Sequence, residues 1–218
     1  MLEVGCGAGG ILEYFRELGC SVKGVDLDEE YVTFGRTDFN LNLSVATIAN
    51  AEIGTPADLV IYAHTLEHIL RPMEELNEVS RRLAHGGLLY VEVPGVKNLA
   101  RDYQNDFLRM LQNAHTYHFS LTSLTNLLRL SGFALVVGDE SIRAVFRREI
   151  LADSDTESTK PKFHTDYAAV RAYLNRIEKR RNQLRNRLLS VSRAGLIRML
   201  KILRLYKIAR NIYWELRK

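Results

Sequence analysis

The chain opens with Met1-Leu-Glu-Val-Gly-Cys-Gly-Ala-Gly-Gly10, and this stretch decides the fold. Its first residues suit a short buried strand and a helical pattern begins at Ile11, so the glycines between them predict a tight strand-to-helix turn. Gly5, Gly7 and Gly9 stand at alternate positions, where a side chain would block a bound ligand or close helix–strand packing. A helix that starts directly after the turn points its free N–H groups at whatever binds there. The stretch therefore predicts a small-molecule site.

Composition limits the class of protein. With 218 residues, of which 46% are hydrophobic and 26% charged, the chain suits one globular domain plus an appendage. Cys6 and Cys20 are too few for a disulfide framework or a metal cluster, which favours a reducing compartment and a cytoplasmic location. No apolar run reaches the roughly 18 residues of a spanning helix. The start of the chain has no signal-peptide pattern, so neither a membrane span nor a leader is expected.

The net charge of +4 conceals two oppositely charged parts. Residues 1–166 carry 15 Lys and Arg against 24 Asp and Glu, whereas residues 167–218 carry 15 against 2. The run 153–161 is polar and has the composition of a linker. We therefore expect a domain over 1–150, a linker over 151–166, and a separate basic tail after it.

Strand and helix patterns alternate through the first part. The expected strands are 2–4, 21–26, 45–48, 58–62, 88–93, 133–137 and 144–146, and the expected helices are 10–18, 29–37, 72–84, 99–111 and 122–131. Gly86 and Gly87 are expected to end the helix that begins at Pro72. Such alternation is typical of an α/β fold with a doubly wound, mostly parallel sheet covered by helices on both faces.

Three features near the glycines distinguish between two kinds of cofactor. The spacing Gly5-x-Gly7-x-x-Gly10 by itself also fits a dinucleotide-binding loop. However, Glu3 lies inside the first strand, where nicotinamide-binding loops usually carry an apolar residue. Asp26 ends the second strand about 20 residues further on, where a carboxylate accepts hydrogen bonds from both ribose hydroxyls. The segment His64-Thr-Leu-Glu-His68 then follows the fourth strand, and together the three features argue against a nicotinamide cofactor.

With these pieces in place, the sequence resembles the class I S-adenosylmethionine-dependent methyltransferases. Within them it is most similar to ubiquinone-biosynthesis enzymes and to enzymes of polysaccharide and lipopolysaccharide pathways. The matching stretches are 2–9, 24–27, 58–61, 66–68, 86–94, 115–120 and 131–133. The resemblance covers roughly residues 1–148 and implies a Rossmann-like, seven-stranded sheet whose last pair is antiparallel, with S-adenosyl-L-methionine as the cofactor. Members usually have helices before the first strand that cover the cofactor, and here Met1 abuts that strand.

The resemblance also implies which residues bind the cofactor. They are Glu3, Gly5, Gly7, Gly9, Asp26, Leu27, Asn50, Ala51 and His64. S-adenosylmethionine has no phosphates, so the glycine loop has only to let the backbone approach the methionine and ribose parts. Glu3 suits the ammonium group of the ligand, directly or through water, with a salt bridge under the sheet as the alternative. Asn50 stands where the family often has Asp, and its carbonyl can still accept a hydrogen bond from the adenine amine.

Histidines are the candidates for the acceptor side. Methyl transfer is an in-line displacement, so positioning supplies most of the rate, but an oxygen nucleophile usually also needs a base. Imidazole titrates near neutral pH, and His64, His68 and His118 are therefore the expected catalytic residues. His115 is a further candidate for lining the acceptor cleft, and for His68, His115 and His118 packing is the alternative. Glu67 with His68 suits a divalent metal, as the resemblance to some ubiquinone-pathway enzymes suggests, but two ligands alone predict no metal.

The tail 167–218 is expected to be a basic amphipathic helix, interrupted near 190–195. Apolar residues recur at three- and four-residue steps, Arg and Lys fill the other faces, and Tyr213 and Trp214 add aromatic anchors near the end. Such a helix fits an anionic membrane surface, a helical partner, a nucleic-acid backbone, or packing against the acidic body.

The function expected from these features is cytoplasmic methyl transfer from S-adenosyl-L-methionine to a small-molecule, saccharide or lipid-linked acceptor. An association of the tail with a membrane surface or a helical partner accompanies this expectation, and nucleic acid ranks below both. One alternative is an RNA methyltransferase that holds phosphates with its tail. The other is a truncated cofactor-binding remnant or scaffold, because nothing precedes the first strand to close over the ligand.

Overall fold

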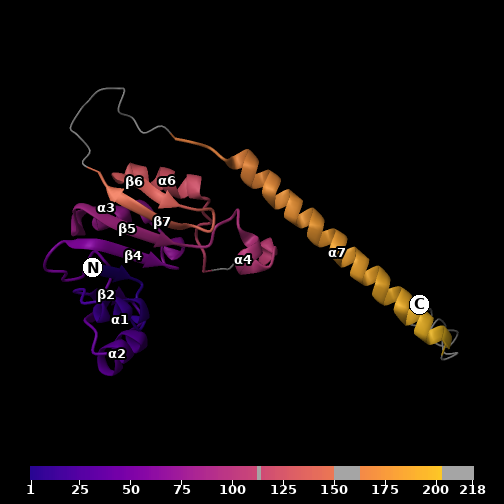
Figure 1. Cartoon of the computed structure of the whole chain (residues 1–218), viewed down its shortest axis with the longest axis horizontal. Coiled ribbons are helices and arrows are strands. Elements are labelled where there is room, and N and C mark those ends of the chain that lie inside the picture. Colours follow the sequence, from indigo (N-terminus) through magenta and orange to yellow (C-terminus); the bar gives the residue numbers. More distant parts are fainter. Residues whose placement is uncertain (112–113, 150–162, 203–218) are drawn as a thin grey trace. The chain divides into compact units, whose positions relative to one another are not determined.

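The computed structural model describes residues 1–111, 114–149 and 163–202, and its centre is a seven-stranded sheet in the order β3-β2-β1-β4-β5-β7-β6 (Figure 1). The strands are β1 (Leu2–Val4), β2 (Lys23–Asp26), β3 (Leu43–Val45), β4 (Ala57–Ala63), β5 (Leu83–Glu92), β6 (Phe133–Gly138) and β7 (Arg143–Arg148). The first five run parallel, and β7 pairs antiparallel with both β5 and β6. The expected Rossmann-like sheet with an antiparallel last pair is confirmed.

Two separate apolar cores hold the helices to this sheet. The helices before residue 150 are α1 (Gly10–Glu17), α2 (Glu29–Asp38), α3 (Pro72–Arg82), α4 (Leu99–Tyr103), α5 (Phe107–Met110) and α6 (Leu121–Leu130), with a 3₁₀ turn η1 (Leu66–His68). The larger core joins α3 and α6 to alternate residues of the central strands, for example through Leu76 and Leu128. The smaller core joins α1 and α2 to β3 through Leu12 and Val32. Each fully buried leucine contributes about 1.5–3 kcal/mol to folding.

Helices cover the second face of the sheet only in part. Along β5, Leu89 and Val91 point into the larger core, whereas Tyr90 on the opposite face is half-buried. Arg143 and Arg147 on the same face of β7 are exposed, because α1 and α2 pack near β2 and β3 at the other end of the sheet. Among the described residues, the cover expected on both faces is therefore complete on one face only.

The glycine pair after α3 does not act as expected. α3 ends and β5 begins at Leu83, so Gly86 and Gly87 lie inside the strand instead of stopping the helix. Gly86 has φ +71°, and the pairing between β4 and β5 shifts register between Ala57 and Leu59. The two glycines thus form an irregularity at the start of the strand, a common use of glycine within sheets.

Two further boundaries differ from the expectation. β3 covers Leu43–Val45 and ends before the expected stretch 45–48 is completed. The expected helix 99–111 is two short helices, because Gln104 and Asn105 between them adopt left-handed φ values of +53° and +60°. Residues in that conformation interrupt a right-handed helix.

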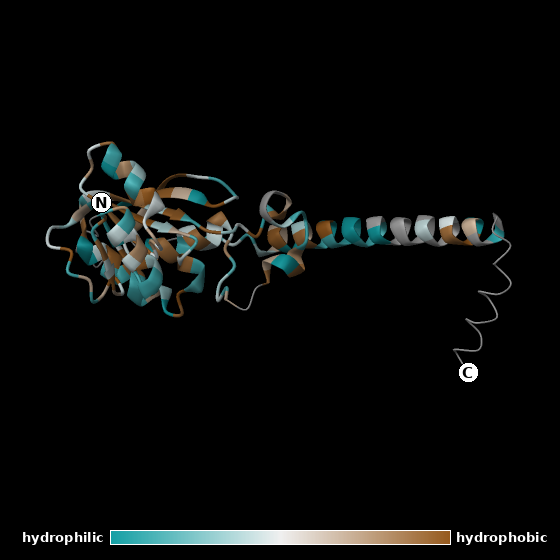
Figure 2. Ribbon diagram, turned by 90° about the horizontal axis from the view of Figure 1, so that it is seen from below, coloured by the Kyte–Doolittle hydropathy of each residue, from teal (hydrophilic) through white to brown (hydrophobic). Residues whose placement is uncertain are grey.

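The chain divides into two units, Met1–Ala172 and Tyr173–Lys218, and one helix, α7 (Tyr167–Ile202), runs from the first into the second. Hydrophilic and hydrophobic residues both lie along its length (Figure 2). Its 36 residues form a single helix, so the interruption expected near 190–195 is wrong; Gly195 costs only about 1 kcal/mol inside a helix. No described helix has both the length and the apolar character needed to cross a membrane. Most of the expected linker, and the aromatic end of the tail, lie outside the described residues.

Candidate functional site

The three alternate glycines of the loop have two different structural roles. Gly5, Gly7 and Gly9 have φ values of +72°, +52° and +84°, which L side chains rarely adopt. A Cβ on Gly5 would lie 2.2 Å from Thr65 Oγ1, and one on Gly9 would lie 2.5 Å from Leu41 Cδ1, so both glycines allow close packing. A Cβ on Gly7 would meet nothing within 4 Å. Of the three, Gly7 is therefore the one that faces open space.

Asp26, the last residue of β2, is tied to this loop. Its Oδ2 accepts a 2.7 Å hydrogen bond from the Gly7 N–H, and its Oδ1 accepts one of 2.9 Å from the Asp28 N–H. A carboxylate oxygen has two lone pairs, so each oxygen retains one for a ligand. Leu27 follows and exposes 72% of its surface, next to the carboxylate in the chain. The arrangement presents a fixed carboxylate, which suits a ribose diol.

Glu3 is a buried carboxylate directly behind the loop. It is 3% exposed, and its Oε2 has no hydrogen-bond partner among the described residues. Burial and, to a lesser extent, the nearby Asp26 raise the pKa of Glu3 to about 8. The salt bridge under the sheet that the sequence left open is not found in the described part of the chain. A buried, unsatisfied carboxylate is costly, and a cationic ligand group would relieve that cost, so the residue fits the ammonium of S-adenosylmethionine.

The segment expected at the adenine is held by a residue that sequence reasoning missed. Arg82 at the end of α3 donates hydrogen bonds to the backbone carbonyls of Ala51, at 2.6 Å, and Ala49, at 2.7 Å. Ala51 is buried, whereas Asn50 is exposed. Arg82 lies 31 residues away along the chain, which is why no local pattern pointed to it.

A second buried carboxylate, Glu67, lies just after β4. It is 1% exposed, and neither carboxylate oxygen has a hydrogen-bond partner within the described residues. Its Oε1 lies 3.7 Å from Nδ1 of His64 and 3.9 Å from Nε2 of His68. His64 reaches this position with a left-handed φ of +54°, and its N–H donates to the carbonyl of Glu92. Glu67 therefore lies between two of the expected catalytic histidines.

The other two histidines, His115 and His118, lie on a loop that is distant along the chain from η1 and is hydrogen-bonded to it. The N–H groups of Thr116 and Tyr117 donate to the Glu67 carbonyl at 2.8 and 3.1 Å. Nδ1 of His68 lies 2.7 Å from the Ala114 carbonyl. Because a carbonyl only accepts, Nδ1 of His68 carries a proton, and in the neutral ring Nε2, on the side of Glu67, is the proton acceptor.

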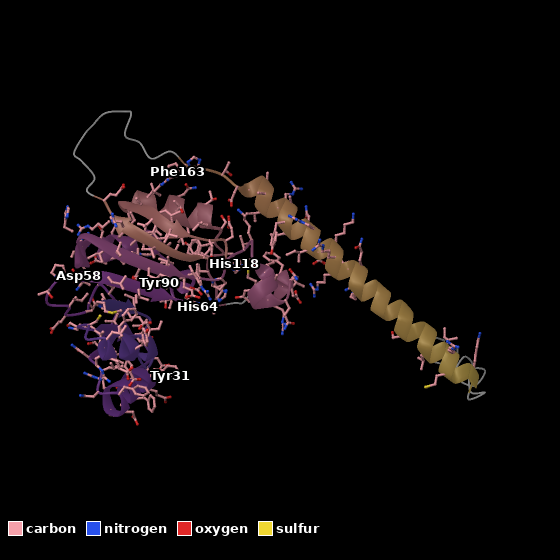
Figure 3. The ribbon with its side chains drawn as sticks, in the orientation of Figure 1. Tyr31, Asp58, His64, Tyr90, His118 and Phe163 are labelled. Carbon is pink, nitrogen blue, oxygen red and sulfur yellow. The ribbon has the colours of Figure 1, made fainter. Side chains whose placement is uncertain are left out.

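The rings of these histidines form a row. The centroids of His68 and His115 are 5.0 Å apart, and those of His115 and His118 are 5.9 Å apart. His64 and His118 lie at the same end of the sheet, whereas Asp58 lies at the opposite end (Figure 3). The structure thus brings all four histidines of the sequence analysis to one place. We call Glu67 and these four histidines the histidine cluster.

Three members of the cluster have the geometry of a metal site. One ligand atom each from Glu67, His68 and His115 lies within 4.8 Å of the other two. The hydrogen bond between His68 Nδ1 and a carbonyl fixes the orientation of the ring, as is usual for an imidazole that binds a metal through its other nitrogen. Burial lowers the pKa of His115, and a neutral imidazole is the form that binds a cation. The sequence predicted no metal because the third donor comes from a segment far from His68.

Comparisons with known proteins show the family to which the chain belongs. The profile of a family described as "Methyltransferase domain" matches residues 1–137. "C-methyltransferase NovU" of Streptomyces niveus is 33% identical over 141 residues, which are 62% of this chain and 33% of that protein. "Ubiquinone biosynthesis O-methyltransferase" of Caulobacter vibrioides is 29% identical over 98 residues, 42% of this chain and 39% of that protein. The chain therefore spans between a third and two fifths of the length of these relatives.

Solved structures show the same fold at lower sequence identity. A SAM-dependent methyltransferase from Thermotoga maritima superposes with a TM-score of 0.54 at 20% identity, covering 67% of this chain and 79% of that one. Magnesium protoporphyrin IX methyltransferase from Synechocystis, solved with bound SAM, gives 0.51 at 15% identity, covering 68% and 69%. Fold, family profile and relatives agree, and the chain belongs to the S-adenosylmethionine-dependent methyltransferases.

Proposed function

We propose that this chain transfers the methyl group of S-adenosylmethionine to a small-molecule acceptor. The observation that carries the proposal is the pairing of two sites on adjacent parallel strands. β1 contains Glu3 and leads into the loop that contains Gly7, whereas β4 leads into the histidine cluster. The two strands pair with Glu3 opposite Ile61. Ligands bind where the carboxyl ends of such strands meet.

On the cofactor side, each residue has one proposed role. Asp26 accepts from the ribose hydroxyls, Glu3 faces the ammonium group, and Gly7 lets the methionine part approach the backbone. Gly5 and Gly9 hold the loop in shape by close packing. Leu27 and Ala51 contact the adenine ring, the Asn50 carbonyl accepts from its amine, and His64 lies at the sulfonium end. When bound, S-adenosylmethionine supplies an electrophilic methyl group.

On the acceptor side, His68 is the proposed general base. Its Nε2 lone pair is free to accept the proton of an acceptor hydroxyl, and its Nδ1–H is fixed by the Ala114 carbonyl. The buried Glu67 carboxylate, 3.9 Å from Nε2, stabilises the imidazolium that forms. His64 and His118 orient the acceptor at either side of this pair.

The three-donor geometry supports a second arrangement of the same site. Glu67, His68 and His115 would then hold a divalent cation, and such a cation polarises an acceptor oxygen and lowers the pKa of its proton. Treatment with EDTA separates the two arrangements. A loss of turnover that Mg²⁺ or Zn²⁺ restores supports the cation, and unchanged turnover supports the free histidine base.

The acceptor class is a proposal drawn from the relatives and the resemblance. The named relatives act in ubiquinone biosynthesis or carry out C-methylation. We propose a saccharide or lipid-linked precursor in the cytoplasm, in polysaccharide biosynthesis, because the resemblance includes enzymes of those pathways.

The basic tail supports a place for this reaction at a membrane surface. Residues 167–218 carry 15 Lys and Arg against 2 acidic residues. Arg180 and Arg185 are exposed on α7, and Leu196 and Met199 expose 53% and 50% of their surfaces. Cationic and apolar groups on one helix suit anionic headgroups and the acyl boundary beneath them. Co-flotation with phosphatidylserine vesicles, lost at high salt, is expected; binding to single-stranded RNA but not to vesicles would favour the RNA reading instead.

Calorimetry with S-adenosylmethionine and with NADH tests the cofactor side first. Saturable binding of S-adenosylmethionine and none of NADH is expected, and the reverse would refute the proposal. Transfer of a labelled methyl group to acceptor pools then tests activity. Binding of S-adenosylmethionine without methyl transfer to any acceptor pool would favour the hypothesis of a cofactor-binding remnant or scaffold.

A further inference from the structure

A short segment beyond the methyltransferase fold returns to the histidine cluster. Residues 163–170 follow the region that the family model matches, which ends at residue 137, and they come after the last strand of the sheet. The segment is paired to α6 by two hydrogen bonds. Asn126 Nδ2 donates to the His164 carbonyl at 2.6 Å, and the His164 N–H donates to Asn126 Oδ1 at 3.3 Å. We call residues 163–170 the strap.

The strap is fixed at a second point by a half-buried carboxylate. Asp166 Oδ2 lies 3.1 Å from Lys97 Nζ, and Asp166 Oδ1 accepts a hydrogen bond of 3.1 Å from Ser120 Oγ. Lys97 also pairs with Glu140 at 2.5 Å, in the loop between β6 and β7. Burial works against the charged form of Asp166, but Lys97 and Ser120 outweigh it and lower its pKa. The strap is thus tied to α6 and its N-cap and to the loop that follows β5.

Between the strap and the domain lies a cavity of about 370 Å³. Its walls are Val96, His118, Ser120, Ser123, Asn126, His164, Thr165, Asp166, Tyr167 and Val170. His118 connects it with the reaction site, since its ring lies 5.9 Å from that of His115. Nδ1 of His118 is buried and has no hydrogen-bond partner in the described part of the chain. A ligand in the cavity can supply that partner.

We propose that this cavity is the acceptor site and that it binds a small hydroxylated ring such as a monosaccharide, an inference that rests on the proposed function. Eight of its ten lining residues carry hydroxyl, amide, carboxylate, phenol or imidazole groups, and the surface exposed between them is more apolar than polar, which suits a ring with a hydroxylated edge and an apolar face. Its volume is near the lower end of the 300–1,000 Å³ typical of ligand sites, which suits a single ring. Tyr167 at its edge is 69% exposed and offers a ring face for stacking. One ligand hydroxyl pairs with His118 Nδ1, which directs that end of the ring toward His115.

Ligand-observed NMR on the full chain tests the proposal, with D-glucose, D-galactose and L-rhamnose as polar probes and catechol as the aromatic probe. Saturation transfer to at least one sugar is expected. Thr165→Trp fills the cavity from its rim and is expected to weaken that binding at least tenfold. The exposed Thr55, before the amino end of β4, gives the matched control Thr55→Trp, which is expected to leave sugar binding unchanged.

Calorimetry with S-adenosylmethionine on the same samples separates the two proposals. Equal S-adenosylmethionine affinity in the wild type and Thr165→Trp, together with loss of sugar binding in the variant, supports the cavity. Binding of catechol but of no sugar, or sugar binding unchanged by Thr165→Trp, overturns it. Sugar binding that depends on Thr165 in a chain that fails to bind S-adenosylmethionine supports the cavity and refutes the proposed function.

Discussion

The two buried glutamates of this protein sit in opposite surroundings. Glu3, behind the glycine loop, has a second carboxylate, Asp26, as its charged neighbour, and its pKa rises to about 8. Glu67, after β4, is flanked by the rings of His64 and His68, each within 4 Å of its Oε1. Among the described residues no cation pairs with Glu3, so the first site suits a cationic ligand, whereas the second supplies its own proton-binding groups. From this difference we propose binding for the first region and proton or metal chemistry for the second.

Glu67→Gln is expected to have the largest effect. The amide neither stabilises an imidazolium nor replaces a carboxylate ligand, so kcat should fall by about 10³-fold or more, within the range of acid–base contributions. The affinity for S-adenosylmethionine should stay within twofold. Exposed Glu74→Gln is the control. Loss of S-adenosylmethionine binding in Glu67→Gln, with kcat preserved, would erase the distinction between the two regions.

Glu3→Gln is expected to change stability with pH. The folded pKa near 8 exceeds the unfolded value of 4.5, so the native state binds the extra proton between these values. The wild type therefore loses stability as pH rises from about 4.5 to 8, by on the order of 4 kcal/mol. The variant lacks this loss and should melt at a higher temperature at pH 9 but not at pH 4. Thermal unfolding of the wild type and the variant across pH 4–9 measures the two melting temperatures. If the plots of melting temperature against pH run parallel for the two proteins, Glu3 is charged at neutral pH.

Asp26→Asn is expected to weaken the binding of S-adenosylmethionine. One oxygen still accepts the Gly7 N–H, but the charge and one acceptor are lost, which costs about 2 kcal/mol or roughly 30-fold in Kd. Asp58→Asn at the opposite end of the sheet (Figure 3) is the matched control and should leave Kd unchanged. Calorimetry on both variants gives the comparison, and an unaffected Asp26→Asn would remove the ribose assignment.

His64→Gln is expected to have the smallest effect. Its side chain is 62% exposed, so water screens its interaction with Glu67 and can replace its contacts. We expect kcat to fall less than fivefold, against about 10³-fold for His68→Gln, whose ring is the proposed base and is fixed by the Ala114 carbonyl. Initial rates of both variants at saturating S-adenosylmethionine decide this. A larger loss of kcat in His64→Gln than in His68→Gln would identify His64, and not His68, as the base beside Glu67.

The residues proposed for the cofactor side were predicted from sequence signals that are local or regular. The glycines after β1 and the acid at the end of β2 follow from the strand–turn–helix repeat, and the structure joins them through the Gly7–Asp26 hydrogen bond. The different tasks of the glycines were not readable. Gly5 is required by Thr65 and Gly9 by Leu41, both distant along the chain.

The sequence by itself determined the parallel sheet, its cofactor loop and the two charge regions, because periodicity, glycine spacing and charge are properties of neighbouring residues. Only the tertiary structure decided that β5 begins at Leu83 and that His115 completes a donor set with Glu67 and His68. It also decided that Asp166 closes a cavity beside His118. The physical reason is the same for the last two. In the donor set and in the cavity alike, the segments that meet lie 46 residues or more apart along the chain. Only packing at the carboxyl ends of β4 and β5 brings them within reach of one another.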